Sequence, residues 1–204
     1  MNREVMISIR PRWCELIACG EKTIEVRKTR PKLETPFKCY IYCTKGDPDA
    51  LFILREEERE KYFGLSAVSC RLDRDPDGAA DGRGKVIGEF VCNRIDKINK
   101  RGVLNNFDYC YLSLNEWGND DIEVEIRDIA GSKIPKDALN EYGKNAPALY
   151  AWHISDLKIY DEPVDITNFR NCNGCEYMGD CDTYCWKPMQ RPPQSWCYVE
   201  EYMR

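Results

Sequence analysis

Three charged residues near the start of the chain, Lys22, Glu25 and Arg27, offer the first chemistry to consider. Glu25 and Arg27 are two positions apart, so on a strand they share one face and can form an ion pair. Lys22 has no comparable structural role. A cationic pocket with one carboxylate suits a nucleotide, because lysine and arginine bind phosphate and a glutamate accepts from an exocyclic amine.

The surrounding residues favour the same chemistry. Residues 1–33 hold eight basic and four acidic side chains, although the whole chain carries a net charge of −5. A basic segment in an acidic chain indicates a local site rather than a protein that coats nucleic acid. The alternative is that solvated strands often carry such charges. The residues expected to bind RNA or a nucleotide are Arg10, Arg12, Trp13, Lys22, Thr23, Glu25 and Arg27, with Trp13 stacking on a base.

A second group with chemical potential lies in the C-terminal part of the chain. Five of the twelve cysteines follow the spacing C-x2-C-x5-C-x3-C-x11-C, at Cys172, Cys175, Cys181, Cys185 and Cys197. Thiolates in a C-x2-C pair can hold one ion from a tight turn, and two more complete a tetrahedron. Sulfur ligands without histidine predict zinc, with an iron–sulfur cluster or unliganded thiols and disulfides as alternatives.

The elements that position these residues are mostly strands. Alternating apolar residues predict strands at 5–9, 23–27, 37–43, 85–95 and 148–160. Helices are predicted from Pro11 to a left-handed Gly20, at 135–142, and, with an exposed surface, at 51–62. Residues 71–84 are too polar for a core and form an inserted loop. His153, on a core strand, is expected to be a packed or hydrogen-bonded residue.

This pattern predicts an α+β fold with a small mixed β-barrel and flanking helices, because the crossings are too short for repeated βαβ units. No apolar run approaches the length of about 18 residues that a membrane helix needs, and Met1–Arg10 lacks the apolar core of a secretory signal. We therefore expect a cytoplasmic protein without membrane contact.

The segment Gly20–Arg27 reads G-x-K-x-x-E-x-R and follows Ile9-Arg10-Pro11 and a helix. This combination resembles the ASCH domain of the PUA-like superfamily. The resemblance implies a PUA-like barrel over 1–163, with an insertion at about 46–84, and a cysteine-rich extension over 164–204. Residues 191–200 resemble the tails of bacterial and phage-encoded ASCH proteins.

In ASCH proteins the region of this motif is the proposed cleft for RNA or a modified nucleobase, which implies a role in RNA metabolism or in regulating transcription or translation. One alternative is a hydrolase, either an amidohydrolase acting on acetylated cytidine or a ribonuclease, with Lys22 and Glu25 as catalytic residues. The amidohydrolase branch has a threonine where this chain has Glu25, and a carboxylate is a poor substitute for that nucleophile. A further alternative is an interaction module whose tail binds a protein partner.

Overall fold

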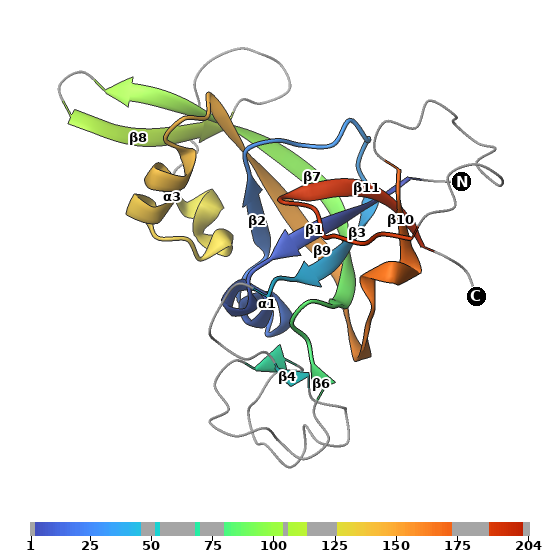
Figure 1. Cartoon of the computed structure of the whole chain (residues 1–204). Coiled ribbons are helices and arrows are strands. Elements are labelled where there is room, and N and C mark those ends of the chain that lie inside the picture. Colours follow the sequence, from blue (N-terminus) through green and yellow to red (C-terminus); the bar gives the residue numbers. More distant parts are fainter. Residues whose placement is uncertain are drawn as a thin grey trace. The chain divides into compact units, whose positions relative to one another are not determined.

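A computed structural model of the chain describes residues 3–45, 52–53, 68–69, 80–103, 106–113, 126–172 and 188–201 (Figure 1). The elements in chain order are β1 (Glu4–Ile9), α1 (Pro11–Ala18), β2 (Ile24–Arg27), β3 (Phe37–Cys43), β4 (Phe52–Ile53), β5 (Val68–Ser69), β6 (Ala80–Asp81), β7 (Val86–Val103), β8 (Asn106–Ser113), η1 (Ile126–Ser132), α3 (Lys136–Gly143), β9 (Ala148–Val164), η2 (Ile166–Asn168), β10 (Phe169–Asn171) and β11 (Trp196–Glu201).

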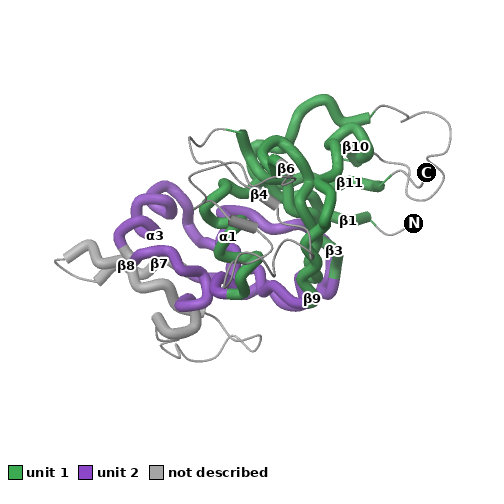
Figure 2. Tube along the Cα trace, turned by 90° about the horizontal axis from the view of Figure 1, so that it is seen from below, with its two compact units in different colours: residues 1–20, 37–91, 156–204 green, residues 21–36, 92–155 purple. Residues whose placement is uncertain are grey.

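The chain divides into two compact units, and it passes between them four times (Figure 2). Unit 1 comprises residues 1–20, 37–91 and 156–204. Unit 2 comprises residues 21–36 and 92–155. The long strands β7 and β9 each contribute one part to unit 1 and the other part to unit 2.

Unit 1 is built on a mixed sheet with the strand order β10-β11-β1-β3-β7-β9. β1 runs parallel to β3 and antiparallel to β11, with Val5 opposite Cys39 and Met6 opposite Cys197. Nearly all residues of β1 and β3 are buried, so both faces of these strands are covered. Alternate residues such as Tyr40 and Tyr42 share one face, which carries an apolar core. This core consists of Met6, Tyr40, Tyr42, Val86, Ile166, Phe169, Met189, Cys197 and Val199.

Helix α1 follows β1 as the sequence predicts. Pro11 occupies the first helical position, where its missing N–H costs nothing, and Cys14 and Ile17 face the interior. The helix ends at Cys19, and Gly20 has φ of 77°, the left-handed conformation that glycine adopts most readily. The predicted stop at Gly20 is confirmed.

The C-terminal part of the chain takes part in the sheet of unit 1. β10 and β11 pair antiparallel, with Arg170 opposite Glu200, and β11 lies beside β1. The sequence predicts residues 164–204 as an extension beyond the barrel domain, and this boundary stays a prediction. Two of its segments, β10 and β11, are strands of the unit 1 sheet. Its residues in the core of that sheet are Ile166, Phe169, Met189, Cys197 and Val199.

Unit 2 contains β2, which pairs antiparallel with β9, and β8, which pairs with β7. Ile24 stands opposite His153, Glu25 opposite Trp152 and Arg27 opposite Tyr150. Helix α3 and η1 contribute to a second apolar core. Its buried members are Ile24, Val26, Ile98, Leu139, Ala146, Leu149 and Ala151.

The predicted α+β class with mixed strands is confirmed, whereas closure into a barrel stays a prediction. The strands predicted at 5–9, 23–27, 37–43, 85–95 and 148–160 and the helix at 135–142 are all present. The predicted helix at 51–62 begins instead with strand β4, which pairs with β5 and β6. Its remainder, and most of the predicted loop at 71–84, lie outside the described residues.

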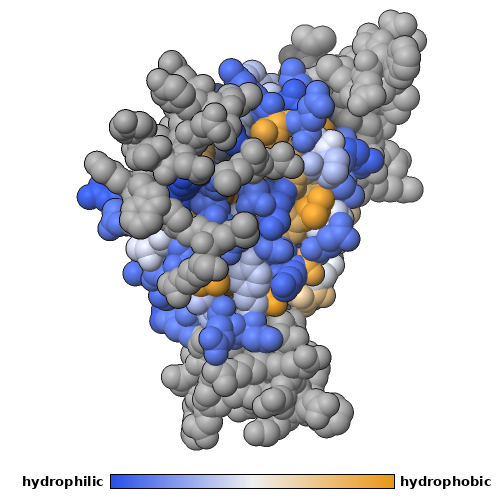
Figure 3. Space-filling model, turned by 90° about the vertical axis from the view of Figure 1, so that its right-hand side faces the viewer, coloured by the Kyte–Doolittle hydropathy of each residue, from blue (hydrophilic) through white to orange (hydrophobic). Residues whose placement is uncertain are grey.

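The described surface is largely polar on the face drawn in Figure 3, where hydrophobic residues form small separate patches between hydrophilic ones. Among the described residues, no helix has the length and apolar character required to span a bilayer.

Candidate functional site

Lys22 is buried inside unit 2, with only 1% of its surface exposed. Its ammonium nitrogen Nζ lies 2.7 Å from the carbonyl oxygen of Ile24 and 2.6 Å from that of Ser132. It also lies 3.3 Å from Glu25 Oε2. A lysine ammonium has three N–H donors, and each has an acceptor here. Burial lowers the pKa of Lys22 below its ordinary value, and the neighbouring Glu25 opposes this shift.

Glu25 links the two cations of the motif. Its Oε2 faces Lys22, and its Oε1 lies 3.0 Å from a terminal guanidinium nitrogen of Arg27. Glu25 and Arg27 are 7% and 9% exposed, so this charged strand face is buried and not open to solvent. Both faces of β2 are covered, and the Glu25–Arg27 pair is a buried interaction.

Residues of η1 complete the environment of Lys22. The N–H of Thr23 donates to the carbonyl of Gly131 at 2.8 Å, which brings the next carbonyl, that of Ser132, onto Lys22. A Cβ atom at Gly131 would lie 2.4 Å from Thr23 Oγ1, so a larger residue here would require the Thr23 side chain to move. The motif therefore depends on Gly131 and Ser132, which lie more than a hundred residues away and carried no signal in the sequence.

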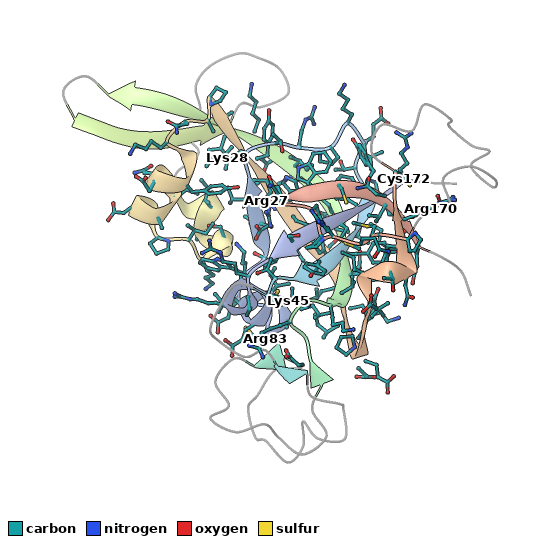
Figure 4. The ribbon with its side chains drawn as sticks, viewed as in Figure 1. Arg27, Lys28, Lys45, Arg83, Arg170 and Cys172 are labelled. Atoms are coloured by element: carbon teal, nitrogen blue, oxygen red, sulfur yellow. The ribbon has the colours of Figure 1, made fainter. Side chains whose placement is uncertain are left out.

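A positively charged, exposed segment leaves the end of β2. Lys28, Arg30 and Lys32 are exposed at alternate positions, while Pro31 between them is buried. Figure 4 shows Arg27 and Lys28 at this end of β2. Pro31 anchors the segment in unit 2 and leaves the flanking cations accessible to solvent.

Tyr142 of α3 lies against the same end of β2. The ammonium of Lys28 is 4.9 Å from the centre of its ring. Burial of the hydroxyl raises the pKa of Tyr142, and Arg27 and Glu25 act on it electrostatically. Sequence reasoning missed Tyr142, because a tyrosine on a short helix is ordinarily a packing residue.

His153 takes part in a polar cluster that joins β9 to β7. Its Nε2 lies 2.7 Å from Asp96 Oδ2 and 3.0 Å from a guanidinium nitrogen of Arg94. The hydrogen bond from His153 and the charge of Arg94 lower the pKa of Asp96, against the opposing effect of burial. The expectation of a hydrogen-bonded histidine is confirmed.

Three of the predicted ligand-binding residues belong to unit 1. Arg10 and Arg12 are exposed at the start of α1, and the Arg12 guanidinium lies 5.5 Å from the centre of the Trp13 ring. Lys22, Thr23, Glu25 and Arg27 belong to unit 2. That all seven residues form one pocket stays a prediction.

Two of the five clustered cysteines lie within the described residues. Cys172 follows β10 and its Sγ is 3.9 Å from Glu200 Oε2 (Figure 4). Cys197 is 2% exposed among apolar side chains, and burial, with a smaller effect of Cys172, raises its pKa to about 12. In the described parts of the chain, no three His, Cys, Asp or Glu residues are placed to hold one metal ion. Cys175, Cys181 and Cys185 lie outside those parts.

Comparison with solved structures identifies the fold. The chain is similar to the ASCH protein of Zymomonas mobilis, with a TM-score of 0.50 and 14% sequence identity over 97% of this chain and 87% of that one. A mutant form of that protein, with a tyrosine replaced by phenylalanine, gives a TM-score of 0.50 and 12% identity over 98% and 91%. No protein-family model and no curated protein matches the chain. The resemblance seen in the sequence is thus confirmed as a shared fold.

Proposed function

We propose that this chain, which has the fold of an ASCH protein, binds RNA or a nucleotide on unit 2 at the end of β2. The observation that carries the proposal is the exposed run of cations Lys28, Arg30 and Lys32, which continues from the buried Glu25–Arg27 pair. No acidic residue occurs between Arg27 and Lys32. Closely spaced lysine and arginine side chains are the usual contacts for phosphate groups.

The buried network gives this surface a rigid base. The bonds from Lys22 fix β2 to η1, and Glu25 fixes Arg27. A charged segment that begins at a firmly held strand end loses less conformational entropy on binding than one on a loose loop. In this proposal Lys22, Glu25 and Arg27 are positioning residues, and the cations after Arg27 approach the ligand.

The same geometry argues for binding over hydrolysis. A general base needs an accessible lone pair, whereas the three N–H groups of Lys22 already have acceptors within the protein. Glu25 is held between two cations and lacks the hydroxyl needed for an acyl intermediate. Hydrolysis of acetylated cytidine or of RNA remains the alternative, and product analysis of the binding mixtures tests it.

The proposal can be tested with a labelled single-stranded RNA of about 15 nucleotides, a length that covers the usual site sizes. The double variant Lys28→Gln/Arg30→Gln removes two exposed charges of the segment. If both contact phosphate, the slope of log affinity against log salt concentration should become shallower by about 1.4. Affinity at low salt should fall by about tenfold or more.

The matched control is Lys97→Gln/Lys144→Gln, which removes two exposed charges of unit 2 outside the segment. This control should keep nearly the wild-type affinity and salt slope. Equal losses in both double variants would show only a general effect of net charge and would contradict the proposed site. Wild-type protein that fails to bind RNA or nucleotides would reject the function itself.

A further inference from the structure

Tyr142 is unusual for its exposure. Among the described residues it is the one large hydrophobic side chain classed as exposed, with 38% of its surface accessible. On the same helix Leu139 is buried in the core of unit 2, and Gly143 is buried as well. A residue that served only to pack α3 against β2 would gain by burying its ring. Packing of the helix alone therefore does not explain why the Tyr142 ring is exposed.

A contact from Lys28 holds this ring beside β2. The Lys28 ammonium lies over the ring at 4.9 Å from its centre. The ring is thereby attached to the end of β2, directly where the exposed cations begin. An aromatic ring already held in place loses little rotational freedom when a second ring stacks on it.

The combination of a fixed, exposed ring with adjacent cations is typical of surfaces that bind single strands. Such surfaces use positive charges along the backbone and aromatic side chains under the bases, because every base has a flat π-face. Duplex RNA keeps its bases stacked internally and offers none of them to an external ring. The cation over Tyr142 adds to its attraction for an electron-rich base.

We infer that Tyr142 stacks on an unpaired nucleobase while Lys28 and Arg30 hold neighbouring phosphates, so that the site selects single-stranded RNA over duplex RNA or a bare sugar–phosphate chain. The inference rests on the proposed function and names its ligand class. Arg27 and Glu25 lie within electrostatic reach of Tyr142.

The test compares two ligands of equal length and charge. One is a single-stranded uridine oligonucleotide of about 15 residues, and the other is its abasic ribose-phosphate counterpart. Wild-type protein should bind the uridine strand about 5- to 150-fold more tightly, the range that stacking on one aromatic residue provides. Tyr142→Leu should lose this preference and keep its affinity for the abasic strand. Tyr142→Trp should retain the preference, which separates loss of the ring from loss of folding.

The matched control is Tyr198→Leu in unit 1, because Tyr198 also has a cation over its ring, Arg3 at 5.8 Å. It should bind both strands as the wild type does. If wild-type protein binds both ligands equally, or if Tyr142→Leu keeps the preference, the stacking inference is wrong while RNA binding stands. If a duplex of the same sequence binds as tightly as the single strand, the selectivity is overturned. If wild-type protein binds neither ligand, the proposed function and the inference fail together.

Discussion

The ammonium group of Lys22 illustrates how a charge can be kept inside a small protein. A buried charge is costly unless its hydrogen bonds are satisfied, and Lys22 has two carbonyl oxygens and one carboxylate for its three donors. The acceptors come from β2 and from η1, so the side chain joins two segments that are distant in sequence. Its removal would leave those acceptors without their donor.

Replacing Lys22 by methionine, which keeps the length and apolar stem of the side chain, should therefore destabilise the protein by about 3 kcal/mol. Equilibrium denaturation in urea, followed by circular dichroism, measures the change in unfolding free energy. Lys28→Met, at an exposed position directly after β2, should change the unfolding free energy by less than about 0.5 kcal/mol. Equal, small effects of both changes would mean that the Lys22 contacts contribute nothing to the fold.

The sequence could indicate which residues of the motif matter but not where their side chains lie. Alternation along 23–27 separates two faces of a strand, and it correctly pairs Glu25 with Arg27. It does not reveal that both faces are covered, because η1, which contacts this strand, lies more than a hundred residues further along the chain. Tyr142 was missed for a related reason, since its importance comes from Lys28 beside it and not from any local pattern.

At the level of elements, local signals predicted the first part of the chain well. Pro11, Gly20 and the alternation in β1, β2 and β3 are properties of neighbouring residues, and those boundaries fall within a few positions of the predicted ones. β7 and β9 extend beyond the predicted strands. Most of their additional residues are charged or polar. Such residues join a strand when the neighbouring strand supplies partners, as His153 does for Asp96.

The His153–Asp96 contact between β7 and β9 should make stability depend on acid pH. The pKa of Asp96 is lowered in the folded protein, so its stabilising effect is complete above the ordinary value of 3.8 and is lost as the pH falls through the lower folded value. From about pH 5 to about pH 2, wild-type protein should lose more unfolding free energy than Asp96→Asn does. Urea denaturation across this range measures both curves.

Glu141→Gln provides the comparison, because it removes an exposed carboxylate from the same unit. Its curve should run parallel to that of the wild type. If the curve of Asp96→Asn is also parallel, the hydrogen bond with His153 does not stabilise the folded state.

For the whole molecule, the order of the chain hides how the units are composed. Unit 2 begins at residue 21, is left after residue 36 and is resumed at residue 92, and unit 1 is completed only by residues 156–204. Dividing the sequence into consecutive segments cannot predict units whose segments alternate along the chain. The pairing of β11 with β1 joins the two ends of the chain in one sheet, and hydrogen bonding between such distant segments leaves no local signal.

The clustered cysteines allow a prediction about the metal content of the whole chain. We propose that Cys172, Cys175, Cys181 and Cys185 hold zinc and that Cys197 is a core residue. Cys197 is 2% exposed and belongs to the apolar core of unit 1, opposite Met6 of β1. Purified protein should contain about one zinc per chain. Cys172→Ser should lose it, whereas Cys197→Ser should keep it and lower the unfolding free energy by about 1–3 kcal/mol.

Metal analysis of the three proteins, prepared under reducing conditions with zinc present, decides between these outcomes. Loss of zinc in Cys197→Ser would place Cys197 among the ligands. Absorbance near 400 nm in place of zinc would favour an iron–sulfur cluster. Metal-free wild-type protein would falsify the site.

The central claim is that single-stranded RNA binds unit 2 at the end of β2. Ultraviolet crosslinking of a uridine oligonucleotide to the full chain, followed by mass spectrometry of the crosslinked peptides, tests it most directly. Crosslinks are predicted in residues 27–32 and in α3 at Tyr142, and they should disappear from α3 in Tyr142→Leu. Crosslinks confined to residues of unit 1, such as Trp13, would contradict the account.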